Sequence, residues 1–194
     1  AGVTRVLLLS TTTGYQIRSF GEAAAALGIR LTIVSDRCDQ LEDPWLDQAI
    51  PVRFHDEHTS VQAVMDAIGE PRPDGILAVG DRPVTLAARL HDAFGLPGHP
   101  ISATLASRNK LLSRRAFQAA DLLVPPFRAL SLDVDPCEAS LAFSYPVVVK
   151  PLAMSGSRGV IRVNSAWEFV GGFERLRTLL LQPDVRVERD AAHD

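Results

Sequence analysis

Short apolar runs alternate with helical segments over the first hundred residues, and this alternation constrains the fold more than any other feature. Strands are expected at 5–10, 30–35, 50–54 and 74–80, and helices at 15–28, 43–49, 60–70 and 82–95. Two of these helices end at glycines, Gly28 and Gly95, which suit a helix C-cap. The pattern predicts right-handed βαβ units, and therefore an α/β domain with a doubly wound parallel sheet covered on both faces.

Polar residues follow several of these strands at their carboxyl ends, where doubly wound sheets bind ligands. Thr12, Thr13 and Gly14 follow the first strand, and Asp81 follows the strand at 74–80. We expect these four residues to contact a substrate. The alternatives are an ordinary strand-to-helix turn for the first three and helix capping for Asp81.

The pattern changes after Pro100. Residues 101–121 are helix-compatible with a break near Ser107, and the prolines of "LLVPPF" end that segment. A strand at 127–132, a helix at 136–143, strands at 145–150 and 159–163, a helix at 165–180 and a polar loop at 182–194 are expected next. The two later strands are close enough to form a hairpin, so this part is α+β. Three parts result: a domain at 1–100, a helical linker at 101–126 and a small lobe at 127–194.

Composition excludes several classes of protein. The net charge of −3 gives no basic excess for nucleic-acid binding. No apolar run approaches the roughly 18 residues of a membrane span, and the start has no basic signal-peptide region. Cys38 and Cys137 match neither a metal spacing nor a disulfide framework. Both tryptophans, Trp45 and Trp167, fall in expected helices, where packing is the default. We expect a cytoplasmic protein that binds neither nucleic acid nor membrane.

Lysine is rare in this chain. Only two of the 20 basic residues are lysines, Lys110 and Lys150, and Lys150 ends the apolar strand "YPVVVK". A loop follows it that contains Ser155, Gly156, Ser157, Arg158 and Gly159. Backbone N–H groups near glycine approach anions closely, so the segment favours phosphate binding. The alternative is a plain hairpin loop with an incidental lysine.

Common nucleotide and metal motifs are missing or weak. No Gly-Lys pair exists for a P-loop, and "STTTGYQ" has one glycine where the dinucleotide fingerprint needs more. The cluster His55 to His58, "HDEH", lacks the helical spacing of zinc proteases, so a solvated loop is favoured over a metal site.

The order of several motifs resembles the carboxylate–amine ligase branch of the ATP-grasp superfamily. These motifs are Arg108-x-Lys110, Val124-Pro-x-Phe127, "PVVVKP" and the Gly/Ser loop. The first hundred residues, including "DRPVTLAARLHDAFGLPGHP", likewise resemble the pre-ATP-grasp domain. The resemblance covers nearly the whole chain, and it implies a pre-ATP-grasp domain, a helical linker and the first lobe of the ATP-grasp fold.

The resemblance also implies a chemistry. Lys110 and Lys150 would contact the phosphates of ATP, with Lys150 also near the adenine, and the loop at 155–159 would close over the β- and γ-phosphates. A carboxylate would attack the γ-phosphate to give an acyl phosphate, which an amine would then convert to an amide. Magnesium would bridge the phosphates. Small-molecule carboxylates and amines are the expected partners, and a homodimer is a family-level expectation.

The sequence also departs from the family pattern. The later acidic strand and the Glu and Glu-x-Asn residues that hold magnesium in the family are expected beyond Asp194, so no metal ligands are expected in this chain. We therefore expect the N-terminal portion of a ligase, inactive by itself. The alternatives are a non-catalytic nucleotide-binding or regulatory module and, opposed by the missing glycines, a Rossmann-like oxidoreductase.

Overall fold

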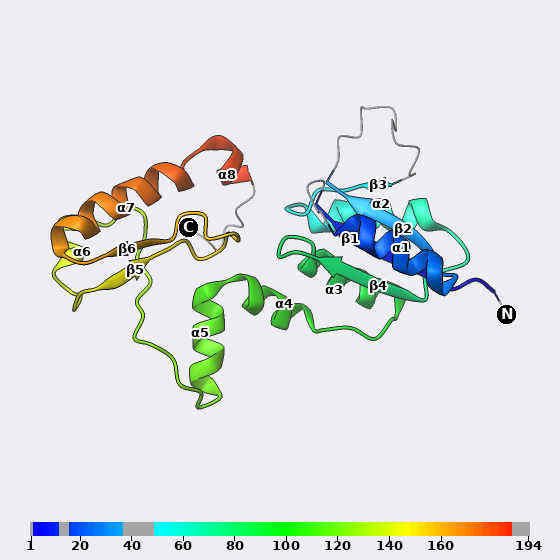
Figure 1. Cartoon of the computed structure of the whole chain (residues 1–194), viewed down its shortest axis with the longest axis horizontal. Helices are drawn as coiled ribbons and strands as arrows, with labels where there is room; N and C mark the ends of the chain where they lie inside the picture. The colour runs from blue at the N-terminus through cyan, green and yellow to red at the C-terminus, as the bar shows by residue number, and fades with distance from the viewer. Residues whose placement is uncertain (1, 12–15, 37–48, 188–194) are drawn as a thin grey trace. The chain divides into compact units, whose positions relative to one another are not determined.

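The chain folds into two compact units, residues 1–105 and 106–194. The computed structural model describes residues 2–11, 16–36 and 49–187 (Figure 1). The expected helix at 43–49, including Trp45, lies outside these residues except for Ala49 at its end. The three-part division expected from the sequence stays a prediction.

The first unit is built on a parallel sheet of four strands in the order β3-β2-β1-β4. The strands are β1 (Arg5–Ser10), β2 (Arg30–Ser35), β3 (Ile50–Pro51) and β4 (Gly75–Val79). Ser10 at the end of β1 lies between Ser35 and Val79. Leu7, Leu8 and Leu9 of this central strand are buried, as expected for a parallel sheet with two covered faces.

Helices cover both faces of this sheet. In Figure 1, α1 (Ile17–Leu27) lies in front of the strands, and α2 (Glu57–Ile68) and α3 (Val84–Phe94) lie behind them. The main core includes Leu7, Leu9 and Val34 of the strands with Val64, Leu86 and Leu90 of the helices. Gly28 and Gly95 adopt the left-handed conformation with φ of 65° and 68°, which confirms the predicted helix ends. The doubly wound fold predicted from the sequence is confirmed.

Two helices follow, α4 (Ile101–Arg108) and α5 (Lys110–Ala119). The break between them falls at Asn109, close to the predicted position. Asn109 is extended and buried, and its side-chain oxygen accepts hydrogen bonds from the N–H groups of Leu111 and Leu112. These bonds satisfy backbone donors that the start of a helix would otherwise leave unpaired, so Asn109 fixes where α5 begins.

The second unit contains an antiparallel hairpin of β5 (Val147–Val149) and β6 (Ile161–Val163), which confirms the predicted pairing. The helix α6 (Pro136–Ser140) precedes it, and α7 (Ala166–Leu180) and α8 (Pro183–Val187) follow it. Figure 1 shows α7 running along the hairpin. Phe169 and Phe173 of α7 pack with Val163 and with the half-buried Val147 and Val149.

The predicted strand at 127–132 is wrong, because the structure has no strand there. The side chain of Arg177 instead binds the backbone at and just after the end of this segment. Its Nε donates to the carbonyl oxygen of Leu132 and its Nη2 to that of Val134, each at 2.7 Å. The segment is thereby attached to α7 in an irregular conformation.

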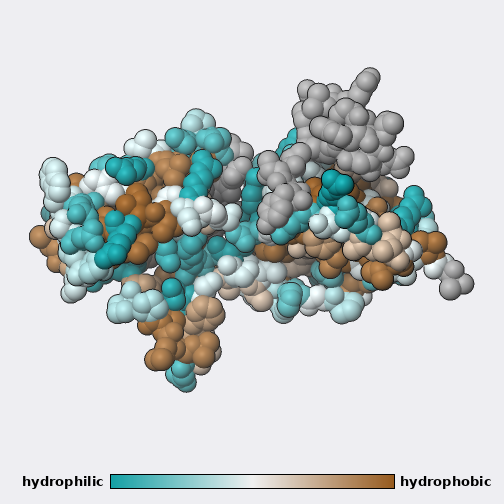
Figure 2. Space-filling view, in the orientation of Figure 1, coloured by the Kyte–Doolittle hydropathy of each residue, from teal (hydrophilic) through white to brown (hydrophobic). Residues whose placement is uncertain are grey.

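Two smaller expectations are also corrected. Part of the predicted polar loop at 182–194 is the helix α8, which starts at Pro183, a residue suited to the first helical position. Val185 of α8 is buried against Leu176 and Leu180. Trp167 is 85% exposed rather than packed. Among the described residues, no helix is long and apolar enough to cross a membrane, and both hydrophilic and hydrophobic residues lie on the face shown in Figure 2.

Candidate functional site

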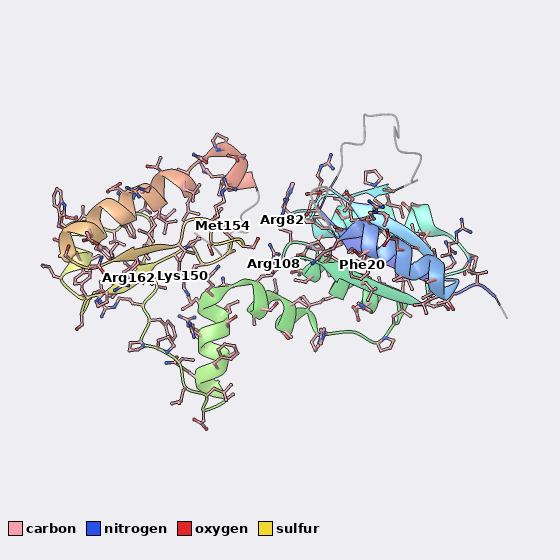
Figure 3. All side chains as sticks on the ribbon, in the orientation of Figure 1. Phe20, Arg82, Arg108, Lys150, Met154 and Arg162 are labelled. Carbon is pink, nitrogen blue, oxygen red and sulfur yellow. The ribbon has the colours of Figure 1, made fainter. Side chains whose placement is uncertain are left out.

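The hairpin of the second unit presents Lys150 on its exposed side. Side chains alternate along a strand, and Val147 and Val149 of β5 face the core with α7. Val148 faces the other way and is 53% exposed, and Arg162 lies opposite it in the register of β6. Lys150, two positions after Val148, is also exposed (Figure 3). This face therefore combines the exposed Val148 with the basic side chains of Lys150 and Arg162.

The loop between the two strands has an unusual backbone. Met154, Gly156, Ser157 and Gly159 have φ values of 112°, 64°, 58° and 76°. Inside it, the N–H of Arg158 donates to the carbonyl oxygen of Ser155 at 3.3 Å. Positive φ values at and next to glycines turn successive N–H groups in ways that regular structure does not, which suits an anion-binding loop.

Gly159 fixes one end of this loop. A Cβ atom at Gly159 would lie 3.0 Å from Leu176 Cδ1 and 3.0 Å from Leu179 Cδ2, so no larger residue fits without movement of α7 side chains. Ser155, Gly156, Ser157 and Arg158 are exposed. The loop is thus attached to α7 at its end and open to solvent in its middle.

Lys110 lies against the same loop. It is the first residue of α5, and its N–H donates to the carbonyl oxygen of Leu152 at 2.8 Å. Its ammonium Nζ donates to the carbonyl oxygen of Met154 at 2.9 Å. The structure therefore brings Lys110 to the loop that begins immediately after Lys150.

The guanidinium of Arg158 makes a weak ion pair with a described residue of its unit. Its Nη2 lies 3.9 Å from Oδ2 of Asp184 in α8, and both side chains are largely exposed. Exposed ion pairs of this kind contribute about 0–1 kcal/mol to stability. Arg158 could therefore leave Asp184 and bind another anion at little cost in free energy.

The first unit carries a second group of polar residues at the carboxyl edge of its sheet. Nη1 of Arg82, after β4, lies 3.3 Å from Oδ2 of Asp36, after β2. Asp81 is exposed, and no side chain caps the start of α3 at Pro83. Thr12, Thr13 and Gly14 lie outside the described residues. The structure thus places Asp81 at the predicted edge of the sheet.

Two residues of "HDEH", Asp56 and Glu57, have structural partners. Asp56 caps α2 by accepting a hydrogen bond from the N–H of Thr59, and this bonding lowers the pKa of the Asp56 carboxyl. Glu57 pairs with Arg89 of α3. Glu57 and His58 line an open pocket of about 370 Å³ whose walls carry both signs of charge. Within the described ranges, no group of three or more His, Cys, Asp or Glu side chains could hold a metal ion.

Sequence reasoning missed three participants in these sites. Asn109 precedes a helical run, and an asparagine there is a standard N-cap signal. Arg162 lies on the exposed face because of the period-two pattern of "VIRV". No local signal identifies Met154, because its role depends on a contact with Lys110, 44 positions earlier.

Comparison with known proteins gives the class of the chain. Residues 21–98 match the family of ATP-grasp N-terminal domains. A D-alanine–D-alanine ligase of Geotalea uraniireducens is 36% identical over 87 residues, which make up 44% of this chain and 28% of that protein. The ATP-grasp enzyme fsqD of Aspergillus fumigatus is 29% identical over 169 residues, covering 82% of this chain and 28% of that enzyme.

Solved structures agree with this relationship at the level of the fold. An L-amino acid ligase from Bacillus licheniformis matches 91% of this chain and 43% of its own, with a TM-score of 0.70 and 23% identity. An N5-carboxyaminoimidazole synthase from Aspergillus clavatus, in complex with ADP and 5-aminoimidazole ribonucleotide, matches 90% of this chain and 44% of its own, with a TM-score of 0.66 and 19% identity.

Residues 21–98 match the ATP-grasp N-terminal domain family, and the similarities to ATP-grasp proteins together support an N-terminal portion of a member of that superfamily. Its curated relatives are ATP-grasp ligases and enzymes, so the family is enzymatic. The matched region spans about 28% of the length of the two curated relatives described above.

Proposed function

We propose that this chain supplies the first part of the ATP site of a carboxylate–amine ligase. The observation that carries the proposal is the contact between Lys110 and the loop after Lys150, because it joins the two lysines of the chain to one glycine-containing loop. An ammonium is a compact point charge suited to phosphate oxygens. The backbone of the loop adds N–H donors that approach an anion closely.

In this proposal Lys110 and Lys150 donate hydrogen bonds to the phosphates of ATP and offset their charge. The exposed residues Ser155 to Arg158 fold over the phosphates and exclude water, which strengthens these electrostatic interactions. The carboxylate of one substrate attacks the γ-phosphorus, ADP leaves, and an acyl phosphate forms. The amine of the second substrate then displaces phosphate and yields the amide.

We include Mg²⁺ in the proposal as the ion that accompanies ATP. Two related structures are described as complexes with ADP or MgADP, which supports ATP and Mg²⁺ as ligands of the full protein. The described residues form no metal-binding group, so we assign none of them to the metal. By itself the chain is proposed to bind nucleotide without completing the reaction.

The first unit is proposed to contact the small-molecule substrates at the carboxyl edge of its sheet. Asp81 and the pair Asp36–Arg82 lie there, and the proposed site also includes Thr12, Thr13 and Gly14. A homodimer remains part of the proposal at the level of the family.

The test is MgATP binding to the chain by titration calorimetry. Lys150→Met removes the charge and retains a side chain of similar length, so we expect affinity to fall by about 1–3 kcal/mol, or roughly 5- to 150-fold. Arg175→Met is the matched control, because Arg175 is an exposed cation on α7. Equal affinity of all three proteins would reject the site.

A further inference from the structure

Two hydrogen bonds attach the loop after β5 to the first residue of α5. The main-chain N–H of Lys110 holds the carbonyl of Leu152, and the side-chain ammonium of Lys110 holds the carbonyl of Met154. The two bonds differ in kind. The first bond joins two main-chain groups, whereas the second uses the group that the proposed function assigns to phosphate.

Met154 is strained at this position. Its φ of 112° lies in a region that residues with a Cβ atom rarely adopt. Such a conformation persists only where the surroundings hold it. Here the Met154 side chain packs against the cluster of Leu176, Leu180 and Val185, and the Met154 carbonyl is held by Lys110. Figure 3 labels Met154 on this loop.

A phosphate bound as in the proposed function would compete with the Met154 carbonyl for the ammonium of Lys110. A lysine has three N–H donors, and a charged phosphate oxygen is a stronger acceptor than a neutral carbonyl. The far end of the loop is fixed by the packing of Gly159 against α7. Any rearrangement is therefore confined to the residues between Leu152 and Gly159.

We propose that Lys110 is a latch on this loop: without nucleotide it holds Met154 in its strained conformation, and a bound phosphate takes the ammonium and releases Met154. The inference rests on the proposed function, because it takes polyphosphate as the anion that Lys110 binds. It adds that phosphate binding to Lys110 and movement of the loop after β5 occur in the same step. The strain at Met154 favours movement as soon as its carbonyl is released.

The test uses the methyl NMR signals of the two methionines, Met65 and Met154, in the whole chain labelled at methionine. Met65 is in the first unit and serves as an internal control. Lys110→Met retains the main-chain bond to Leu152 and removes the ammonium. We expect the Met154 signal to shift in Lys110→Met without any ligand. Inorganic tripolyphosphate added to the wild type should move it in the same direction.

A pair of substitutions at residue 154 separates the effect of backbone strain from the loss of the methionine side chain. Met154→Ala and Met154→Gly both remove the side chain, but only glycine adopts the positive φ without strain. Hydrogen exchange of residues 153–158 should accelerate roughly tenfold when Lys110→Met is combined with Met154→Ala, since a charge-assisted bond that opposed opening is lost. With Met154→Gly the added effect of Lys110→Met should be clearly smaller.

The outcomes separate the latch from the proposed function. An unchanged Met154 signal in Lys110→Met, or equal acceleration in the alanine and glycine backgrounds, would overturn the latch whatever the ligand. If the latch signals appear but tripolyphosphate does not bind, the phosphate site and the release step are both rejected. If tripolyphosphate binds and the Met154 signal stays in place, Lys110 holds both groups and the latch is wrong.

Discussion

Arginine and lysine have different tasks in the second unit. Arg177 uses its planar fork to reach three acceptors, the carbonyls of Leu132 and Val134 and the carboxylate of Glu174. It also stacks over the ring of Phe173, with 5.1 Å between its Cζ atom and the ring centroid. Lys110 instead directs one ammonium at the Met154 carbonyl. Arg177 thus links separate segments of the second unit. The ammonium of Lys110, in the proposed function, exchanges the Met154 carbonyl for a phosphate oxygen.

Replacing Arg177 by Met should destabilise the chain by about 2–4 kcal/mol, since two carbonyls lose charge-assisted hydrogen bonds while partly buried. Urea unfolding measures the change. Arg175→Met, on the exposed side of the same helix, should change the free energy of unfolding by about 0.5 kcal/mol or less. Equal effects of the two substitutions would show that the carbonyl contacts of Arg177 contribute nothing.

Gly159→Ala should destabilise the chain by about 2–3 kcal/mol, because it adds a positive-φ penalty to contacts of 3.0 Å with Leu176 and Leu179. Gly156→Ala is the matched control. Its φ is also positive, at 64°, but nothing lies within 4 Å of the added Cβ, so we expect about 1 kcal/mol. Thermal unfolding of both variants measures the difference, and the account fails if Gly156→Ala is the more damaging change.

At the scale of elements, α7 organises the second unit. Ser165 caps it by accepting a hydrogen bond from the N–H of Glu168. The carboxylate of Glu168 in turn accepts bonds from the N–H and side-chain amide of Asn164, at 2.8 and 2.9 Å. These reciprocal bonds fix the start of α7 immediately after β6, and so determine which α7 residues face the hairpin.

The same bonds lower the pKa of the Glu168 carboxyl, chiefly through the N–H of Asn164. A lowered pKa means that the charged form stabilises the folded chain above the usual carboxyl pKa of 4.5 and that this stabilisation is lost as the pH falls through the folded value. We expect Glu168→Gln to be less stable than the wild type at pH 7. The difference should shrink as the pH falls below 4.5, as measured by urea unfolding across pH. A difference independent of pH would contradict the assignment.

Most elements could be predicted from local pattern, and the exceptions have a common cause. Helices with glycine ends and the strands of the parallel sheet follow from periodicity within a few residues. The segment 127–132 has a strand-like pattern, but Arg177 binds its backbone from 45 positions away. The helix α8 likewise depends on the burial of Val185 against α7. Contacts of this kind leave no trace in the local sequence.

At the scale of the molecule, the chain divides its polar groups between two units. The first places Asp36, Asp81 and Arg82 at the carboxyl edge of a parallel sheet. The second places Lys110 beside the loop that follows Lys150. The rarity of lysine identified both residues from composition. Their common loop could not be derived from spacing, because it depends on how α5 and the hairpin fold together.

The most direct test of the account is hydrogen exchange of the whole chain with and without MgATP. The account predicts slower exchange in two segments, 108–113 at the start of α5 and 150–160 around the loop, because nucleotide would bind both. Segments 5–11 and 80–84, which reach the carboxyl edge of the sheet in the first unit, should change much less. Protection confined to those sheet-edge segments, with none at 108–113 or 150–160, would contradict the central claim that the second unit holds the phosphates.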